Sequence, residues 1–267
     1  MNRVLILVMA TSREPWAQFQ RVQLETWGTA LPANVSVLRY FKTGPTHPWA
    51  TRTSSWREAL RFGRRGRIQR FADHAFNRRA RRMRVTATLD ARGDLEVPVP
   101  DFIHWNGVAT IAALKWVLAN GEYDFILRVN SSAYVNTPAL LQFIATQDAS
   151  ADVYAGSIES GQLFWGTDFA NGAAVLLSRN LAMRIVDHAD TWDHRFTDDV
   201  SLGVMAADLG TSPVAMPVMR ISTSAELENL TADTARSQVA IRLKSTELPR
   251  DEEARMRRIQ QLLPEPA

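Results

Sequence analysis

The chain has 267 residues, 46% of them hydrophobic, and a formal net charge of +3. It contains no cysteine, which excludes disulfides and thiolate metal sites and indicates a reducing compartment. Its apolar runs fall well short of the ~20 residues that a membrane-spanning helix needs, so the composition predicts a soluble globular protein.

The start of the chain follows a strand, helix and strand pattern. The apolar run at 3–10 is too short for a signal peptide and is not followed by a cleavage-like region, so it predicts a first strand. An amphipathic helix then extends to Gly28, and the β-branched and aromatic residues at 35–41 predict a second strand. This order of elements indicates a parallel sheet.

A strongly basic segment interrupts this pattern at 44–84. Its part from 61 to 84 holds ten arginines against one acid, a net charge of +9, while the rest of the chain has 21 basic and 27 acidic residues. The apolar positions, which end with Ala75 and Phe76, share one helical face among the arginines. Either this is a solvated helix packed by that face, or it contacts an anionic membrane surface or an acidic glycan. Nucleic acid is disfavoured, because no base-stacking aromatic pattern accompanies the arginines.

The stretch 123–136 is the one around which the chain is organised. Residues 125–129 are apolar with one charge, Arg128, and predict a buried strand that ends in the polar turn Asn130-Ser131-Ser132. We expect Thr137 to cap the helix that follows. The strand ends of open α/β sheets bind ligands, although an ordinary strand, turn and helix would have the same pattern.

The remaining elements are assigned by the same patterns. The sequence predicts a hairpin at 84–99, a buried helix at 106–120, strands at 153–158, 173–177, 214–221 and 238–243, and helices at 178–190 and 200–209. Asp198 and Asp199 open the last of these helices, where the helix dipole alone would suit two carboxylates. We expect one domain over 1–249, with the segment 250–267 as an amphipathic helix that is packed on or binds a partner.

Four pieces of the sequence, in order, resemble the β-1,3-glycosyltransferase family that includes galactosyltransferases and Fringe proteins. They are Arg21 with Thr26-Trp27-Gly28; Asp101-Phe102 with Ala113-Leu114-Lys115-Trp116 and Leu127-Arg128-Val129; the loop and strand 164–178; and Asp198-Asp199-Val200 with Gly203 and Leu209-Gly210. The resemblance covers most of residues 3–210. It implies an α/β, GT-A-like (Rossmann-like) fold with a mostly parallel central sheet flanked by helices, here carrying the basic insertion 44–84.

The chain departs from that family where the family binds its metal. Asn130-Ser131-Ser132 stands in place of the aspartate triplet, and no histidine follows His194. Divalent cations prefer carboxylate oxygens, so we expect no metal site and no required cofactor, with no need for manganese or magnesium. The family's luminal members carry cysteines and a membrane anchor, which this sequence lacks.

The resemblance implies an inverting hexosyltransferase of β-1,3 type that moves a sugar from a uridine diphosphate sugar to a glycan hydroxyl. We expect a cytoplasmic, bacterial-type protein of polysaccharide biosynthesis, peripheral at the inner face of the membrane, with an acidic or membrane-associated acceptor. Two alternatives stay open: a catalytically inactive protein of this fold that binds nucleotide or glycan, and an adaptor that works through the arginine-rich helix.

The expected chemistry assigns roles to particular residues. Asp199 is the expected base for the acceptor proton and Asp198 the second candidate. The nucleotide-sugar would be bound by Thr11, Ser12, Arg21, Arg128, Asn130, Ser131, Ser132, Arg242 and Lys244, and the sugars by Trp165, Asn171 and Gly172. Strand alternation places Arg242 and Lys244 on one face, where they would replace the metal beside the diphosphate, unless they are solvent-facing charges on an edge strand.

Overall fold

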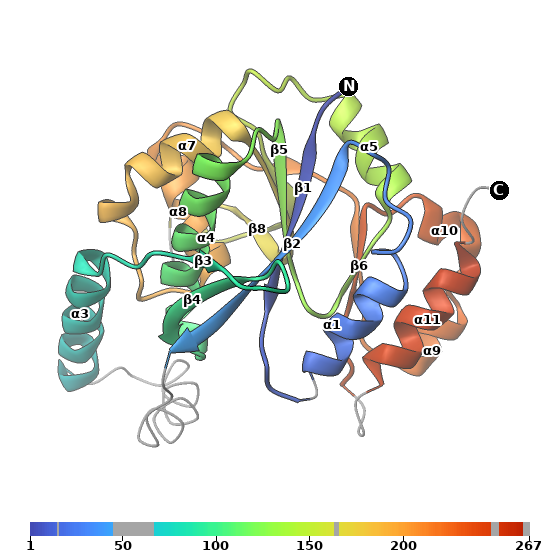
Figure 1. Ribbon diagram of the computed structural model, residues 1–267, viewed down its shortest axis with the longest axis horizontal. Helices are drawn as coiled ribbons and strands as arrows, with labels where there is room; N and C mark the ends of the chain where they lie inside the picture. Colours follow the sequence, from blue (N-terminus) through green and yellow to red (C-terminus); the bar gives the residue numbers. More distant parts are fainter. Residues whose placement is uncertain (15, 45–66, 163–165, 247–250, 264–267) are drawn as a thin grey trace.

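An eight-stranded mixed sheet with helices on both faces forms the centre of the molecule, shown as a computed structural model in Figure 1. The structure describes residues 1–14, 16–44, 67–162, 166–246 and 251–263. The strand order is β3-β4-β2-β1-β5-β8-β7-β9. The strands are β1 (Val4–Ala10), β2 (Val35–Gly44), β3 (Thr88–Leu89), β4 (Leu95–Pro100), β5 (Phe125–Asn130), β7 (Tyr154–Glu159), β8 (Phe169–Ser178) and β9 (Val214–Ala215).

The predicted α/β class, with a central sheet flanked by helices, is confirmed. The pairs β1–β2, β1–β5, β2–β4 and β7–β9 are parallel, whereas β3–β4, β5–β8 and β7–β8 are antiparallel. The parallel sheet expected from the first strand, helix and strand is therefore present at β1 and β2, and the predicted hairpin at 84–99 is the antiparallel pair β3–β4. The strands run parallel in four of these seven pairings.

Alternation along β1 divides the core in two. Val4, Ile6 and Val8 face one cluster of buried residues, while Leu5 and Leu7 face the other. The first cluster is covered by α1 (Trp16–Glu25), α5 (Thr137–Ala145) and α11 (Glu252–Leu262), and the second by α4 (Asn106–Asn120), α7 (Arg179–Asp187) and α8 (Asp198–Asp208). Every residue of β1 except Met9 is buried, which explains its continuous apolar run.

A second sheet of three strands lies beside the first. It consists of β10 (Val218–Ile221), β11 (Ala240–Leu243) and β6 (Ala133–Val135), with β11 in the middle. The short helices α9 (Ser224–Glu228) and α10 (Ala232–Arg236) lie between β10 and β11 in the sequence. The single strand predicted at 214–221 is wrong: it is split between the two sheets. Pro217 lies at the break, where it has no N–H to continue a ladder and its carbonyl accepts a hydrogen bond from the Val239 N–H at 2.8 Å.

Other boundaries also differ from the prediction. The N-cap of α5 is Asn136 and not Thr137. The strand β6, which was not predicted, ends at Val135, so Asn136 is the residue between the strand and the helix. Helix α11 is packed on, since Met256 and Ile259 are fully buried in the cluster that contains α1. The division of the chain at residue 249 stays a prediction.

Helix α3 (Arg67–Arg82) lies at the periphery of the molecule, where it contacts the turn η2 (Ala189–Thr191), and Figure 1 shows it apart from the central sheet. Its predicted packed face is wrong at Ala75, which is exposed, and the contacts are made by Phe76, Asn77 and Ala80. The Phe76 ring meets Trp105 edge-on with centroids 5.1 Å apart. The buried face of α3 differs from the predicted one because the helix packs against the segment 191–194, to which Asn77 and Arg81 are hydrogen-bonded. The side chains at 67–73, and all of 45–66, lie outside the described residues.

Arg81 belongs to this contact and not to the free basic surface. Its guanidinium donates to the carbonyls of Trp192 and Thr191 at 2.8 and 2.7 Å. Among the residues that the structure describes, none of the helices combines the length and the hydropathy that crossing a membrane requires.

Candidate functional site

A polar cleft of about 560 Å³ opens at the carboxyl ends of β1, β2 and β5. Neighbouring parallel strands end at the same edge of a sheet, so the residues that follow each of them meet there. The tip of β11 and the first turn of α8 close the cleft from other sides. Its polar lining consists of Thr11, Arg13, Lys42, Asp101, Asn106, Arg128, Asn130, Ser131, Ser132, Thr197, Asp198, Asp199, Arg242 and Lys244.

Most of the residues assigned to the site from the sequence meet in this cleft. They are Thr11, Arg128, Asn130, Ser131, Ser132, Gly172, Asp198, Asp199, Arg242 and Lys244. Ser12 is exposed outside the lining, and Arg21 lies on the outer surface of α1, with its guanidinium 3.6 Å from the Glu14 carboxylate. Asn171 lies next to the lining, where its side chain binds Arg242, and Trp165 lies outside the described residues.

The buried ion pair between Arg128 and Asp198 forms the floor of the cleft. Arg128 is 2% exposed, its Nη2 donates to the Asp198 carboxylate, and its Nη1 donates to the Gly172 carbonyl at 2.5 Å. Burial opposes the charge of Arg128, but Asp198 and other neighbours outweigh it and raise the pKa of the guanidinium. Burial raises the pKa of Asp198 against the opposing effect of Arg128. Asp198 is therefore engaged in a structural ion pair with Arg128.

Asp199 is the carboxylate that remains open to the cleft. Its Oδ2 accepts from the Gly172 N–H at 3.0 Å, and its Oδ1 accepts from the Val200 N–H at 3.0 Å. A Cβ at position 172 would lie 2.8 Å from Asp199 Oδ2 and 3.2 Å from Arg128 Nη1, so the absence of a side chain at Gly172 lets both groups approach. Each carboxylate oxygen keeps acceptor capacity, and the half-buried side chain lines the cleft.

Arg242 and Lys244 reach the cleft from the smaller sheet. The edge-strand alternative is wrong, because β11 lies between β10 and β6. Arg242 Nη1 donates to Asn171 Oδ1 at 2.9 Å. Its pKa is lowered, first by burial and then by the charges of Arg220 and Arg128. Cations of this kind favour a bound anion, which would offset both effects.

Lys42 and Asp101 belong to the cleft, but sequence reasoning gave them no role. Lys42 Nζ lies 3.0 Å from Asp101 Oδ1 and donates to Asn106 Oδ1 at 2.6 Å, and Thr11 Oγ1 donates to Asp101. Burial lowers the pKa of Lys42. The available signal was its place directly after the predicted strand 35–41. With this pair included, the lining holds five cations (Arg13, Lys42, Arg128, Arg242 and Lys244) and three carboxylates (Asp101, Asp198 and Asp199).

The polar turn is oriented by hydrogen bonds. Asn130 Nδ2 donates to the Gly172 carbonyl at 3.2 Å, and Ser132 Oγ donates to Asn130 Oδ1 at 3.2 Å. Within the described ranges, no three histidine, cysteine, aspartate or glutamate side chains are grouped so as to hold a metal ion. Independence from a metal stays a prediction.

Comparisons with known proteins give structural likenesses only. No family model matches the sequence, and no curated protein matches it. A mannosyltransferase from Pyrobaculum calidifontis, in complex with GDP-mannose and Mn²⁺, is similar with a TM-score of 0.48 and 9% identity, over 93% of this chain and 58% of that one. The chain thus spans little more than half of that protein's length.

The matches to two further solved structures each cover most of both chains. The galactosyltransferase LgtC, in complex with donor and acceptor sugar analogues, has a TM-score of 0.46 and 10% identity over 96% of this chain and 95% of that one. Mouse xyloside xylosyltransferase 1 has a TM-score of 0.41 and 11% identity over 90% of this chain and 97% of that one. At these scores the likenesses assign no residue and no substrate to this chain.

The floor of the cleft yields a stability prediction. Arg128→Met should lower the free energy of unfolding by about 3–5 kcal/mol, because it leaves the Asp198 carboxylate buried without its cation. The double variant Arg128→Met/Asp198→Leu should recover most of that loss, as measured by urea denaturation. Arg3→Met is the control, since it removes an exposed ion pair with Glu122 and should cost less than about 1 kcal/mol. A double variant no more stable than Arg128→Met would contradict the structural role of the pair.

Proposed function

We propose that the chain is a glycosyltransferase that moves a sugar from a nucleotide-sugar to a glycan hydroxyl with inversion. The observation that carries the proposal is the presence of one open carboxylate, Asp199, and two cations, Arg242 and Lys244, on the same cleft. Transfer from a nucleoside diphosphate needs a base for the acceptor proton and positive charge for the departing diphosphate. The uridine diphosphate donor, the hexosyl group and the β-1,3 linkage rest on the family resemblance alone.

The proposed step balances as a single displacement. The acceptor oxygen attacks the anomeric carbon, and its proton passes to the Asp199 carboxylate. The bond from that carbon to the diphosphate oxygen breaks, and its electron pair leaves with the diphosphate. Arg242 and Lys244 would stabilise the charge that develops on the leaving group. Asp199 is preferred to Asp198 because the latter is bound by Arg128.

The donor would lie across the carboxyl ends of β1 and β5. Thr11 and the turn Asn130-Ser131-Ser132 offer hydroxyl and amide groups to its ribose and phosphates. We propose that Gly172 and Asn171 lie toward the sugars, as expected from the sequence; Trp165, which the sequence assigned the same role, lies outside the described residues. The two predicted donor contacts Ser12 and Arg21 are not retained, since both lie outside the cleft lining.

We also propose that fixed cations replace the metal ion of the resembling family. The turn Asn130-Ser131-Ser132 offers amide and hydroxyl groups in place of the aspartate triplet. Arg242 of β11 and Lys244, which follows that strand, line the same cleft. A cytoplasmic location and a role in polysaccharide biosynthesis remain proposals that follow from the resemblance and the absence of cysteine.

A catalytically inactive binder of the same ligands is the second candidate, favoured by the loss of the aspartate triplet. Slow hydrolysis of the donor in the absence of acceptor separates the two, because an inactive binder shows none.

Replacement of the proposed base should separate turnover from binding. A thermal-shift screen of nucleotide-sugars identifies the donor, since a ligand at 100 times its Kd adds roughly 2.7 kcal/mol of stability. Asp199→Asn should then lower kcat for transfer or donor hydrolysis about a hundredfold or more, with donor Kd nearly unchanged, because the base acts on the proton in the transition state.

The control is Asp208→Asn, which changes an exposed carboxylate at the other end of the same helix and should keep full activity. Full activity of Asp199→Asn would sink the assignment of the base.

The cation proposal predicts metal-independent donor binding. Calorimetric titration with the identified donor should give the same Kd in excess chelator and in added manganese. Arg242→Ala or Lys244→Ala should raise that Kd roughly ten- to a hundredfold, because each removes a charge-assisted contact to phosphate.

Arg220→Ala is the matched control, since Arg220 pairs in register with Arg242 on the neighbouring strand but does not line the cleft. Binding that disappears with chelator and returns with manganese would defeat the proposal.

A further inference from the structure

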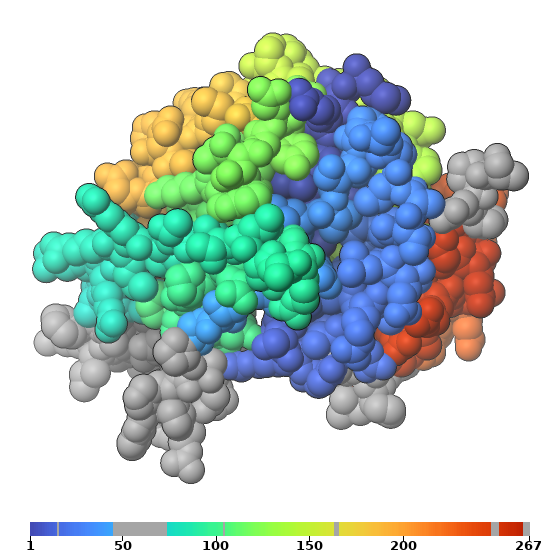
Figure 2. All heavy atoms as spheres, in the orientation of Figure 1, coloured from blue at the N-terminus to red at the C-terminus, as the bar shows by residue number. Residues whose placement is uncertain are grey.

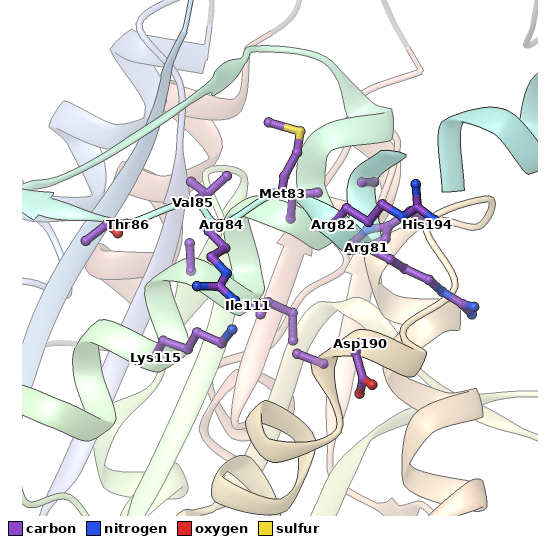
Figure 3. A pocket seen from close by; sticks show the side chains of 14 residues that line it. Arg81, Arg82, Met83, Arg84, Val85, Thr86, Ile111, Lys115, Asp190 and His194 are labelled. Atoms are coloured by element: carbon purple, nitrogen blue, oxygen red, sulfur yellow. The ribbon is translucent and has the colours of Figure 1, made fainter. Parts of the chain in front are cut away.

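A second pocket, of about 630 Å³, lies apart from the donor cleft and shares no lining residue with it. Figure 3 shows it between the end of α3, the linker 83–86, helix α4 and the turn η2 (Ala189–Thr191). Its volume is within the range of small-molecule sites. None of the described residues assigned to the proposed transfer reaction lines this pocket.

Cations dominate its rim. Arg82, Arg84 and Lys115 line the pocket and are exposed, and within the described part of the chain no ion pair joins them to an acid. In Figure 3 the ends of Arg84 and Lys115 approach each other beside Ile111. The one acid among its lining residues is Asp190, on the opposite wall. Two like charges that point toward each other repel, and an anion between them would be attracted to both.

The other titratable groups do not change this balance. Arg81 is engaged by the carbonyls of Thr191 and Trp192. His194 lines the pocket, but burial lowers its pKa to about 4, so it is neutral near pH 7. Arg81 keeps its charge but its guanidinium is held by those carbonyls, so the cations placed to contact a bound anion are Arg82, Arg84 and Lys115.

The floor of the pocket is apolar. Val108, Ile111 and Ala112 of α4 form it, with Val85 from the linker at its side. These three side chains are themselves buried in the core, so the apolar surface that the pocket exposes comes mainly from the half-buried Met83 and Val85 of the linker. A free inorganic anion or a sugar would use the rim and leave Met83 and Val85 against water, whereas an amphiphile would contact both the rim and these side chains.

We propose that this pocket binds the phosphate of an anionic lipid, with the adjoining hydrocarbon against Met83 and Val85. The neighbouring surface has the same charge, because Arg78 and Arg79 are exposed on α3 and would face anionic headgroups beside the bound one. In Figure 2 the teal spheres of α3 and the linker lie on the surface at the end of the molecule opposite the red C-terminal helix.

The test uses the full-length protein and a soluble lipid, so that general attraction to a charged surface does not contribute. Dihexanoylphosphatidylglycerol below its micelle concentration and inorganic phosphate are titrated separately by calorimetry. The lipid should bind about tenfold or more tightly than phosphate, because two or more buried CH₂ groups at ~0.8 kcal/mol each exceed a factor of ten. Val85→Ser changes a half-buried lining residue, and it should weaken lipid binding and leave phosphate binding unchanged.

Paired variants of equal charge distinguish the pocket from the rest of the basic surface. Arg84→Gln/Lys115→Gln should weaken lipid binding about tenfold or more, since each basic group near an anionic headgroup contributes about a factor of five. Arg78→Gln/Arg79→Gln removes the same charge from the same region outside this pocket and should change it less than about threefold.

Three outcomes would overturn the proposal: no binding of the lipid, equal affinity for lipid and phosphate, or equal weakening by the two double variants. Unchanged donor affinity in both double variants serves as the control for folding.

Discussion

The buried ion pair of Arg128 and Asp198 is the interaction on which the geometry of the cleft depends. Arg128 belongs to β5, at the junction where the parallel strands meet antiparallel β8. Through its two terminal nitrogens it holds the first turn of α8 and the Gly172 carbonyl of β8. Asp199 follows Asp198 directly and is fixed by the Gly172 N–H, so its position is set by the same contacts.

This arrangement has a cost that the surrounding groups partly offset. Two charges are taken out of water, and such a pair is favourable only if the remaining polar atoms also find partners. Asn106 Nδ2 and Thr110 Oγ1 lie 3.5 Å from the Asp198 oxygens, and Tyr40 is hydrogen-bonded to Thr110 at 3.0 Å. A buried polar network of this kind fixes orientation more than it adds stability, which suits a site where one carboxylate is held so that the next is available.

The sequence predicted those parts of the fold that depend on local patterns. Strands β1 and β2, the hairpin and helix α4 follow from apolar runs and periodicity, because burial on both faces or one face leaves a direct trace in the residue order. The strand β6 was missed because three residues carry no period. The split at Pro217 and the sideways packing of α3 depend on tertiary partners that local patterns do not contain.

The residues of the candidate site also divide into those that local sequence patterns predict and those that depend on distant parts of the chain. Residues at or directly after the end of a buried strand, such as Asn130 and Thr11, could be predicted because the carboxyl ends of parallel strands meet. Arg21 lies outside the cleft lining, and the motif that named it does not say which face of the helix turns outward. The partner of Arg128 lies 70 residues further along the chain, so its engagement by Asp198 was not visible in the sequence.

A crystal structure with the donor nucleotide-sugar bound tests the central claim most directly. The account predicts the nucleotide across the ends of β1 and β5, with a diphosphate oxygen within about 3.5 Å of the Arg242 guanidinium. The Asp199 carboxylate should face the anomeric carbon from the opposite side of the diphosphate. A nucleotide bound outside this cleft, or a diphosphate held by a metal ion on Asp198 and Asp199 instead of by Arg242, would contradict it.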